Sequence, residues 1–141
     1  MSKKSLSGRT FFKINVNETI ADKTKNEKVG FNDMVLSWLV NEQNARSENV
    51  AVGHTHKPPG GEHKLHLHKN AEEVIFMLKG KGVEICGDKE IELKTGDCIY
   101  IPRGMPHSHK NSGNEPSETI FVYAGAPSFE KTGYVLLENK R

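Results

Sequence analysis

The sequence predicts an all-β fold, built as a sandwich or barrel of short antiparallel strands. Short runs rich in β-branched and aromatic residues recur along the 141 residues, and glycine, proline and asparagine separate them. Many short strands with turn signals between them are typical of these two architectures. No run has the length and period of an amphipathic helix. Because the length fits one core, we expect a single domain over residues 1–141.

The expected strands follow one another along the whole chain. Besides the histidine-rich segment KLHLH (64–68), they are TFFKINV (10–16), MVLSWLV (34–40), ENVAVGHTH (48–56), EVIFMLKG (73–80), GVEIC (82–86), KEIEL (89–93), DCIYI (97–101), ETIFVYAG (118–125) and GYVLLE (133–138). We therefore divide the domain into N-terminal strands and an arm (1–47), a barrel core (48–125) and a C-terminal strand with a tail (126–141).

Two connections between these strands are predicted hairpins. They are LKGKGVEI (78–85) and CGDKEIEL (86–93), the second with a Gly-Asp pair at its tip. The polar segment 17–33 is predicted to be a loop or a short helical turn.

Composition and charge exclude several classes of function. Lysine and arginine number 20 against 18 aspartates and glutamates, and the charges are scattered, so nucleic acid is not an expected partner. No apolar run reaches the length of a signal peptide or a membrane span, and we expect a cytoplasmic protein. The sequence contains no phosphate-binding loop or dinucleotide fingerprint and no evident nucleophile and base pair, so a metal would have to carry any catalysis.

Histidine is the unusual residue of this chain. All seven histidines fall between positions 54 and 109. In KLHLHKNAEEV (64–74), His66 and His68 share one face of a strand, with Leu65 and Leu67 on the other. Periodicity alone would bury the leucines and leave the imidazoles in water. However, two loops rich in proline and glycine, 56–64 and 101–107, each lead into a histidine, which brings imidazoles toward one place.

The spacing of ten residues in 60–111 resembles the two signature motifs of the cupin superfamily. The first motif is Gly60, His66, His68, Glu73 and Gly80, and the second is Gly96, Pro102, Gly104, His107 and Asn111. The resemblance implies a cupin double-stranded β-helix, which is a jelly-roll barrel of antiparallel strands. It also implies that one metal ion is bound inside the barrel by His66, His68, Glu73 and His107.

Chemistry agrees with this implied ligand set. Three neutral imidazoles and one carboxylate suit one divalent Fe, Mn, Ni, Co or Zn ion per chain. Four protein ligands on an octahedral ion leave two positions for water, dioxygen or an oxygen-bearing substrate. Glu72 is the alternative carboxylate: Glu73 has the commoner spacing, whereas Glu72 fits only a shorter variant of the motif.

Two further residues are candidate catalytic groups beside the metal. His109 lies two residues after His107 and should face the same interior, either as a proton shuttle or as a core histidine bonded to a backbone carbonyl. Tyr123 shares a face with Phe121 and either donates to a bound oxygen atom or belongs to the core.

The positions of four further residues relative to the expected barrel mouth are less constrained by the sequence. His54 and His56 either line the pocket or lie at an exposed edge, and His63 is expected at the rim. Arg103 either receives an anionic substrate at the mouth or is a solvated turn residue.

The sequence therefore favours a small metalloenzyme that acts on a small oxygenated organic molecule by dioxygenase-, isomerase- or lyase-type chemistry. The alternative is a cupin that binds a sugar or an organic acid without turnover. We also expect a homodimer, because Leu65 and Leu67 make the outer face of their strand apolar.

Overall fold

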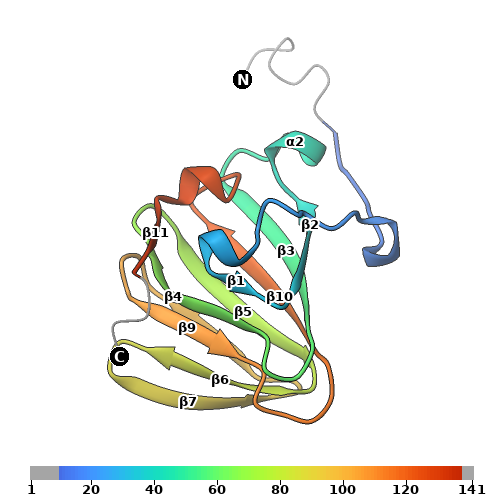
Figure 1. The fold of residues 1–141 in the computed structure, drawn as a ribbon. Coiled ribbons are helices and arrows are strands. Elements are labelled where there is room, and N and C mark those ends of the chain that lie inside the picture. Colours follow the sequence, from blue (N-terminus) through green and yellow to red (C-terminus); the bar gives the residue numbers. More distant parts are fainter. Residues whose placement is uncertain (1–9, 138–141) are drawn as a thin grey trace.

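A computed structural model describes residues 10–137, which form two antiparallel sheets that face each other (Figure 1). The five-stranded sheet has the order β2 (Val35–Val40), β3 (Val50–Lys57), β10 (Ser117–Ala124), β5 (Glu72–Lys79) and β8 (Cys98–Ile101). The other sheet has the order β1 (Phe31–Asn32), β4 (Glu62–His68), β9 (His107–Lys110), β6 (Lys81–Cys86) and β7 (Lys89–Lys94), and β11 (Tyr134–Leu136) also pairs with β4. The predicted all-β jelly roll is confirmed.

In the part of the chain that the structure describes, helical structure is limited to short turns outside the sheets. These are η1 (Val16–Glu18), η2 (Glu27–Val29), α2 (Glu42–Ala45) and η3 (Glu130–Thr132). Between residues 10 and 137 no helix is both long enough and apolar enough to cross a membrane.

The predicted strand at 10–16 is wrong. Residues 10–15 form no strand, and the side chain of Phe11 is 91% exposed. The cause is local: Asn15 accepts a hydrogen bond from Asn17 N–H, and Glu18 accepts one from Asn15 N–H. This capping box starts η1 and ends the extended run.

One of the two predicted hairpins is also wrong. Strands β6 and β7 do form a hairpin, with Cys86 opposite Lys89. By contrast, β5 and β6 lie in different sheets, so the segment between them is a corner where the chain crosses over. Gly80 makes this corner with φ of 88°, and its N–H and C=O both bond to the Thr95 hydroxyl.

Alternation along β3 and β10 gives the interior an apolar end and a polar end. The inward positions of β3 run from Ala51 to Lys57, and those of β10 run from Tyr123 to Ser117, antiparallel to them. Apolar and aromatic residues therefore lie opposite one another at one end, and threonine, serine and lysine lie at the other. Both ends are buried.

Gly53 is required for the packing of Phe121. The two residues are direct cross-strand partners, and a Cβ built on Gly53 would lie 2.1 Å from the nearest atom of the Phe121 ring. The ring therefore lies directly on the backbone of β3, where it contacts Trp38 edge-on at 5.6 Å between centroids.

We predict that Gly53→Ala lowers the free energy of unfolding by about 1–3 kcal/mol, because the added methyl group overpacks the core. Urea denaturation measures this loss. The double variant with Phe121→Leu should be less destabilised than the sum of the two single variants, since the smaller side chain leaves room for the methyl group. Simple additivity would contradict this packing explanation.

Candidate metal centre

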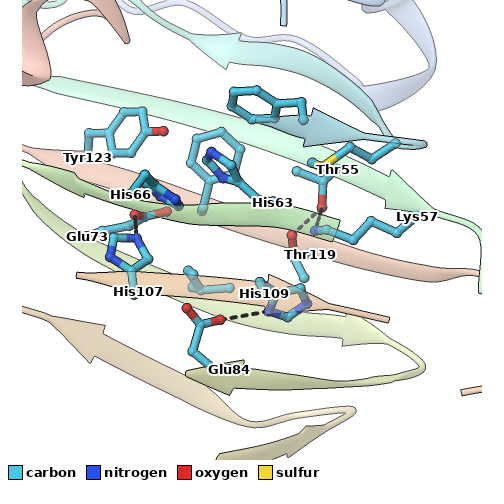
Figure 2. A pocket seen from close by; sticks show the side chains of 14 residues that line it. Thr55, Lys57, His63, His66, Glu73, Glu84, His107, His109, Thr119 and Tyr123 are labelled. Atoms are coloured by element: carbon cyan, nitrogen blue, oxygen red, sulfur yellow. Dashed lines mark hydrogen bonds and ion pairs between the residues drawn. The ribbon is translucent and has the colours of Figure 1, made fainter. Parts of the chain in front are cut away.

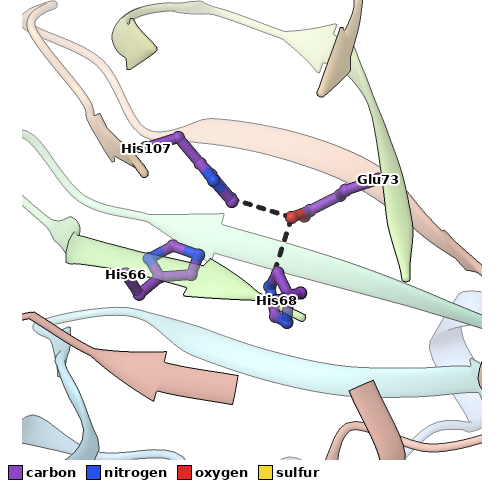
Figure 3. Close-up of side chains that lie close together, drawn as sticks. All are labelled: His66, His68, Glu73 and His107. Carbon is purple, nitrogen blue, oxygen red and sulfur yellow. Dashed lines mark hydrogen bonds and ion pairs between the residues drawn. The ribbon is translucent and has the colours of Figure 1, made fainter. Parts of the chain in front are cut away.

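Three imidazoles from one sheet and one carboxylate from the other meet inside the sandwich (Figure 3). His66 and His68 come from β4, and His107 comes from β9, where it is the cross-strand partner of His66. Glu73 comes from β5 in the facing sheet. All four are buried, and their ligand atoms lie within 4.8 Å of one another. The group could hold a metal ion, and its role as the ligand set stays a prediction.

Backbone carbonyls orient two of these imidazoles. His66 Nδ1–H donates to the carbonyl oxygen of Lys64 at 2.6 Å, and His107 Nδ1–H donates to that of Met105 at 2.9 Å. With the proton on Nδ1, the Nε2 atom of each neutral ring faces the cluster with its lone pair, which is the form that binds a metal.

A hydroxyl orients the third imidazole. His68 Nδ1–H donates to Thr132 Oγ1 at 2.8 Å, and the Thr132 hydroxyl donates in turn to the carbonyl oxygen of Phe129 at 2.7 Å. Thr132 is fully buried in η3. The C-terminal segment therefore holds His68 in the same tautomer as the other two rings.

The free nitrogens and the carboxylate fit a divalent cation. Glu73 Oε1 lies 3.0 Å from His107 Nε2 and 3.4 Å from His68 Nε2. Burial opposes ionisation of Glu73, but the adjacent imidazoles of His107 and His68 outweigh it and hold its pKa well below the usual range. The buried Nε2 atoms of His66 and His68 have no hydrogen-bond partner within residues 10–137. Because buried polar atoms are normally satisfied, a bound cation would supply the partner that these two nitrogens lack.

Glu72, the alternative carboxylate, lies outside this group. Its Oε1 accepts a 2.5 Å hydrogen bond from the Tyr100 hydroxyl, and its Oε2 lies 3.8 Å from Arg103 Nη1. The Arg103 side chain is 52% exposed, as the solvated reading expected.

Five of the six site residues line a chamber with a volume of about 30 Å³ (Figure 2). By volume this chamber has room for about two water molecules. His66, Glu73 and His107 line it, and so do the two predicted catalytic residues, His109 and Tyr123. The ring of Tyr123 lies 4.7 Å from that of His68, the sixth residue, between centroids. Geometry thus allows both predicted roles without testing either.

Residues that the sequence analysis did not single out form the polar end of this chamber. They are Thr55, Lys57, Glu84 and Thr119. Glu84 Oε1 lies 2.7 Å from His109 Nδ1, so His109 bonds to a carboxyl group and not to a backbone carbonyl. Burial raises the pKa of Glu84 to about 8 and lowers that of Lys57 to about 8. The Lys57 amine is therefore still mainly protonated, and so positively charged, at pH 7.

His63 lies nearer the centre than predicted. Its ring stacks on His66 at 3.6 Å and on Phe31 at 3.9 Å between centroids, and it lines the chamber. Its Nε2–H donates to the Tyr134 hydroxyl at 3.0 Å, and that hydroxyl donates to the carbonyl oxygen of Val29. The expectation of a rim position is wrong.

The other two histidines lie on the outer face of β3. His54 Nε2 lies 2.8 Å from Glu118 Oε1, and His56 is exposed. Neither lines the chamber, so the pocket-lining alternative is wrong for both. His56 instead lines a surface groove of about 560 Å³, which also has Phe31 and Met34 in its wall. These two side chains line the chamber as well and therefore separate it from the groove.

The fold and the His-Glu group together define a jelly-roll protein with a candidate metal site inside the barrel. The sequence model of the family described as "Cupin domain" matches residues 53–123. This chain belongs to the cupin family.

Comparisons with individual proteins agree with this family. An uncharacterized protein of Methanocaldococcus jannaschii is 41% identical over 63 residues, which are 45% of this chain and 50% of that protein. The oxalate-binding protein of Thermotoga maritima is 26% identical over 105 residues, 74% of this chain and 87% of the relative. A variant of Bacillus subtilis oxalate decarboxylase has a TM-score of 0.74 and 23% identity over 91% of this chain and 33% of that one. The chain thus spans half of the first relative and a third of the decarboxylase, for which the likeness shows the fold alone.

We predict that Thr132→Val lowers metal affinity about 10- to 100-fold, because it removes the acceptor that orients His68. Competition with a chromophoric chelator measures the affinity. Ser128→Ala is the matched control, because it removes a hydrogen bond to Lys131 N–H near the same turn without touching a histidine. Equal affinities of Thr132→Val and the wild type would show that the Thr132 contact does not tune the site.

Proposed function

We propose that this protein is a metal-dependent cupin in which His66, His68, Glu73 and His107 hold one divalent ion that binds a small oxygenated organic molecule. The observation that carries the proposal is the convergence of four buried ligand atoms, in which the Nε2 atoms of His66 and His68 have no hydrogen-bond partner within residues 10–137. Iron, manganese, nickel, cobalt and zinc all suit such a donor set.

The relatives support a small oxygenated acid as the ligand. One curated relative is named an oxalate-binding protein. A Bacillus subtilis oxalate decarboxylase structure, with a TM-score of 0.66 and 21% identity to this chain, is described with Mn(II) centres. For this chain the metal and the ligand are proposals that these likenesses favour.

We infer a catalytic function, of dioxygenase, isomerase or lyase type, from the residues around the ligands. His66, His68, Glu73 and His107 would hold a divalent ion, which would act there as a Lewis acid toward an oxygen atom of the substrate. Phe121 and Ile75 help to exclude water from the chamber. His109 is held by Glu84 and can accept or deliver a proton, and Tyr123 can donate its hydroxyl proton to a substrate oxygen.

The alternative is a cupin that binds the same small molecule without turnover. The small chamber and the name of the Thermotoga maritima relative favour it. A measurement of ligand consumption distinguishes the two functions, because only the enzyme consumes the molecule that it binds.

We predict about one divalent ion per chain in protein purified without added metal or chelator, measured by elemental analysis. His107→Ala should lose this metal because it removes a ligand, whereas His56→Ala should keep it because His56 lies outside the chamber. Metal retained in His107→Ala, or none taken up by the wild type after reconstitution, would refute the site.

The same preparation separates the reaction types when it is incubated with small organic acids and diketones. Iron with substrate-dependent oxygen uptake indicates a dioxygenase. Substrate loss without oxygen uptake indicates an isomerase or a lyase. Saturable binding without loss of the ligand indicates the binding protein.

We also propose a cytoplasmic homodimer. Leu65 and Leu67 are only half-buried on the outer face of β4, and Leu137 N–H donates to the carbonyl oxygen of Leu65 beside them. A second chain would cover the apolar surface that remains. We therefore predict a sedimentation mass of two chains at micromolar concentration, and a mass of one chain would contradict the dimer.

A further inference from the structure

Lys57 is a buried cation without a counter-ion in contact. It points inward from the end of β3, and the residue is 3% exposed. Its Nζ donates one hydrogen bond, to Thr55 Oγ1 at 3.2 Å. Within residues 10–137 no carboxylate oxygen lies within 4.0 Å of Nζ. Since an ammonium has three N–H donors, this environment leaves donors and a charge unmatched.

The carboxylates that share the chamber with Lys57 are engaged elsewhere. Glu73 faces His107 and His68, and it belongs to the proposed ligand set. Glu84 bonds to His109 at 2.7 Å. With a divalent ion in place, the ion and Lys57 together outweigh Glu73, and the chamber stays net positive even when Glu84 is ionised. An anionic ligand would offset this excess.

The amine of Lys57 faces the chamber, and its neighbours do not require it for structural reasons. Figure 2 shows its amine beside Thr55 and Thr119, and Lys57 lines the chamber together with His63, His66, Glu73 and His107. The hydroxyls of Thr55 and Thr119 already bond to each other at 2.5 Å, so they do not need the amine. An apolar side chain of the same length would fill the space at a lower desolvation cost.

We propose that Lys57 anchors an anion subsite at the polar end of the chamber and that the ligand of this protein is a small carboxylate. Its carboxylate group bonds to Lys57 Nζ, and a second oxygen atom reaches the His-Glu group. The second contact and the net positive charge of the chamber rest on the proposed function, whereas the unmatched ammonium of Lys57 does not. Because the chamber is small, about 30 Å³, it favours the smallest carboxylates, such as a two-carbon hydroxy acid or keto acid.

A pair of isosteric probes tests the subsite. Titration calorimetry gives the affinity of glycolate and of its neutral amide, glycolamide, for the wild type and for Lys57→Met, and the metal content of each preparation is measured first. Lys57→Met replaces the cation with an apolar chain of similar length, so folding should be preserved. Lys25→Met is the matched control: Lys25 is a second buried lysine, but it pairs with Asp22 and Glu130 outside the chamber.

The expected result is that the wild type and Lys25→Met bind glycolate about 10- to 100-fold more tightly than glycolamide, and that Lys57→Met loses this preference while it keeps its metal. A preference that survives in Lys57→Met, or a wild type without one, overturns the subsite. A wild type that holds no metal but has a preference that depends on Lys57 would refute the proposed function and leave the subsite standing.

Discussion

The structure depends on the meeting of two sheets at one carboxylate. Glu73 projects from the five-stranded sheet, and its Oε1 lies within 3.4 Å of imidazole nitrogens on β4 and β9 of the other sheet. Facing sheets lie about 10 Å apart, so side chains of this length can meet only near the middle of the layer. Two backbone carbonyls and the Thr132 hydroxyl orient the three imidazole rings toward Glu73. Gly80 turns the chain from the sheet that carries Glu73 to the sheet that carries the histidines.

The sequence predicted the part of this arrangement that follows from regular strands. On a strand, Glu72 and Glu73 must point to opposite faces, and motif spacing selected the one that the structure places with the histidines. The all-β class followed in the same way from short alternating runs. The predicted strand at 10–16 failed because alternation does not show whether a run has a partner to pair with, and a capping box ends this run.

The parts that were missed lie where regular alternation does not decide the question. Between His63 and His66 the register of β4 against β9 shifts, so His63 can stack on His66 although the two positions have opposite parity. On β3, parity separates Lys57 and Thr55 from His54 and His56, but it does not say which set faces inward. The sequence analysis considered His54 and His56 as pocket residues, but Lys57 is the one that lines the chamber. Glu84 carries no motif and is recognised only by its contact with His109.

The chamber and the outer groove share a wall that contains none of the proposed metal ligands. Phe31 and Met34 line both spaces, and neither belongs to the His-Glu group. Methionine is unbranched and adapts its shape readily. These two side chains, on one short N-terminal segment, would therefore limit how far a ligand in the chamber could extend toward the groove. Evolution or design could join the groove to the chamber there and extend the range of substrates without altering the metal ligands.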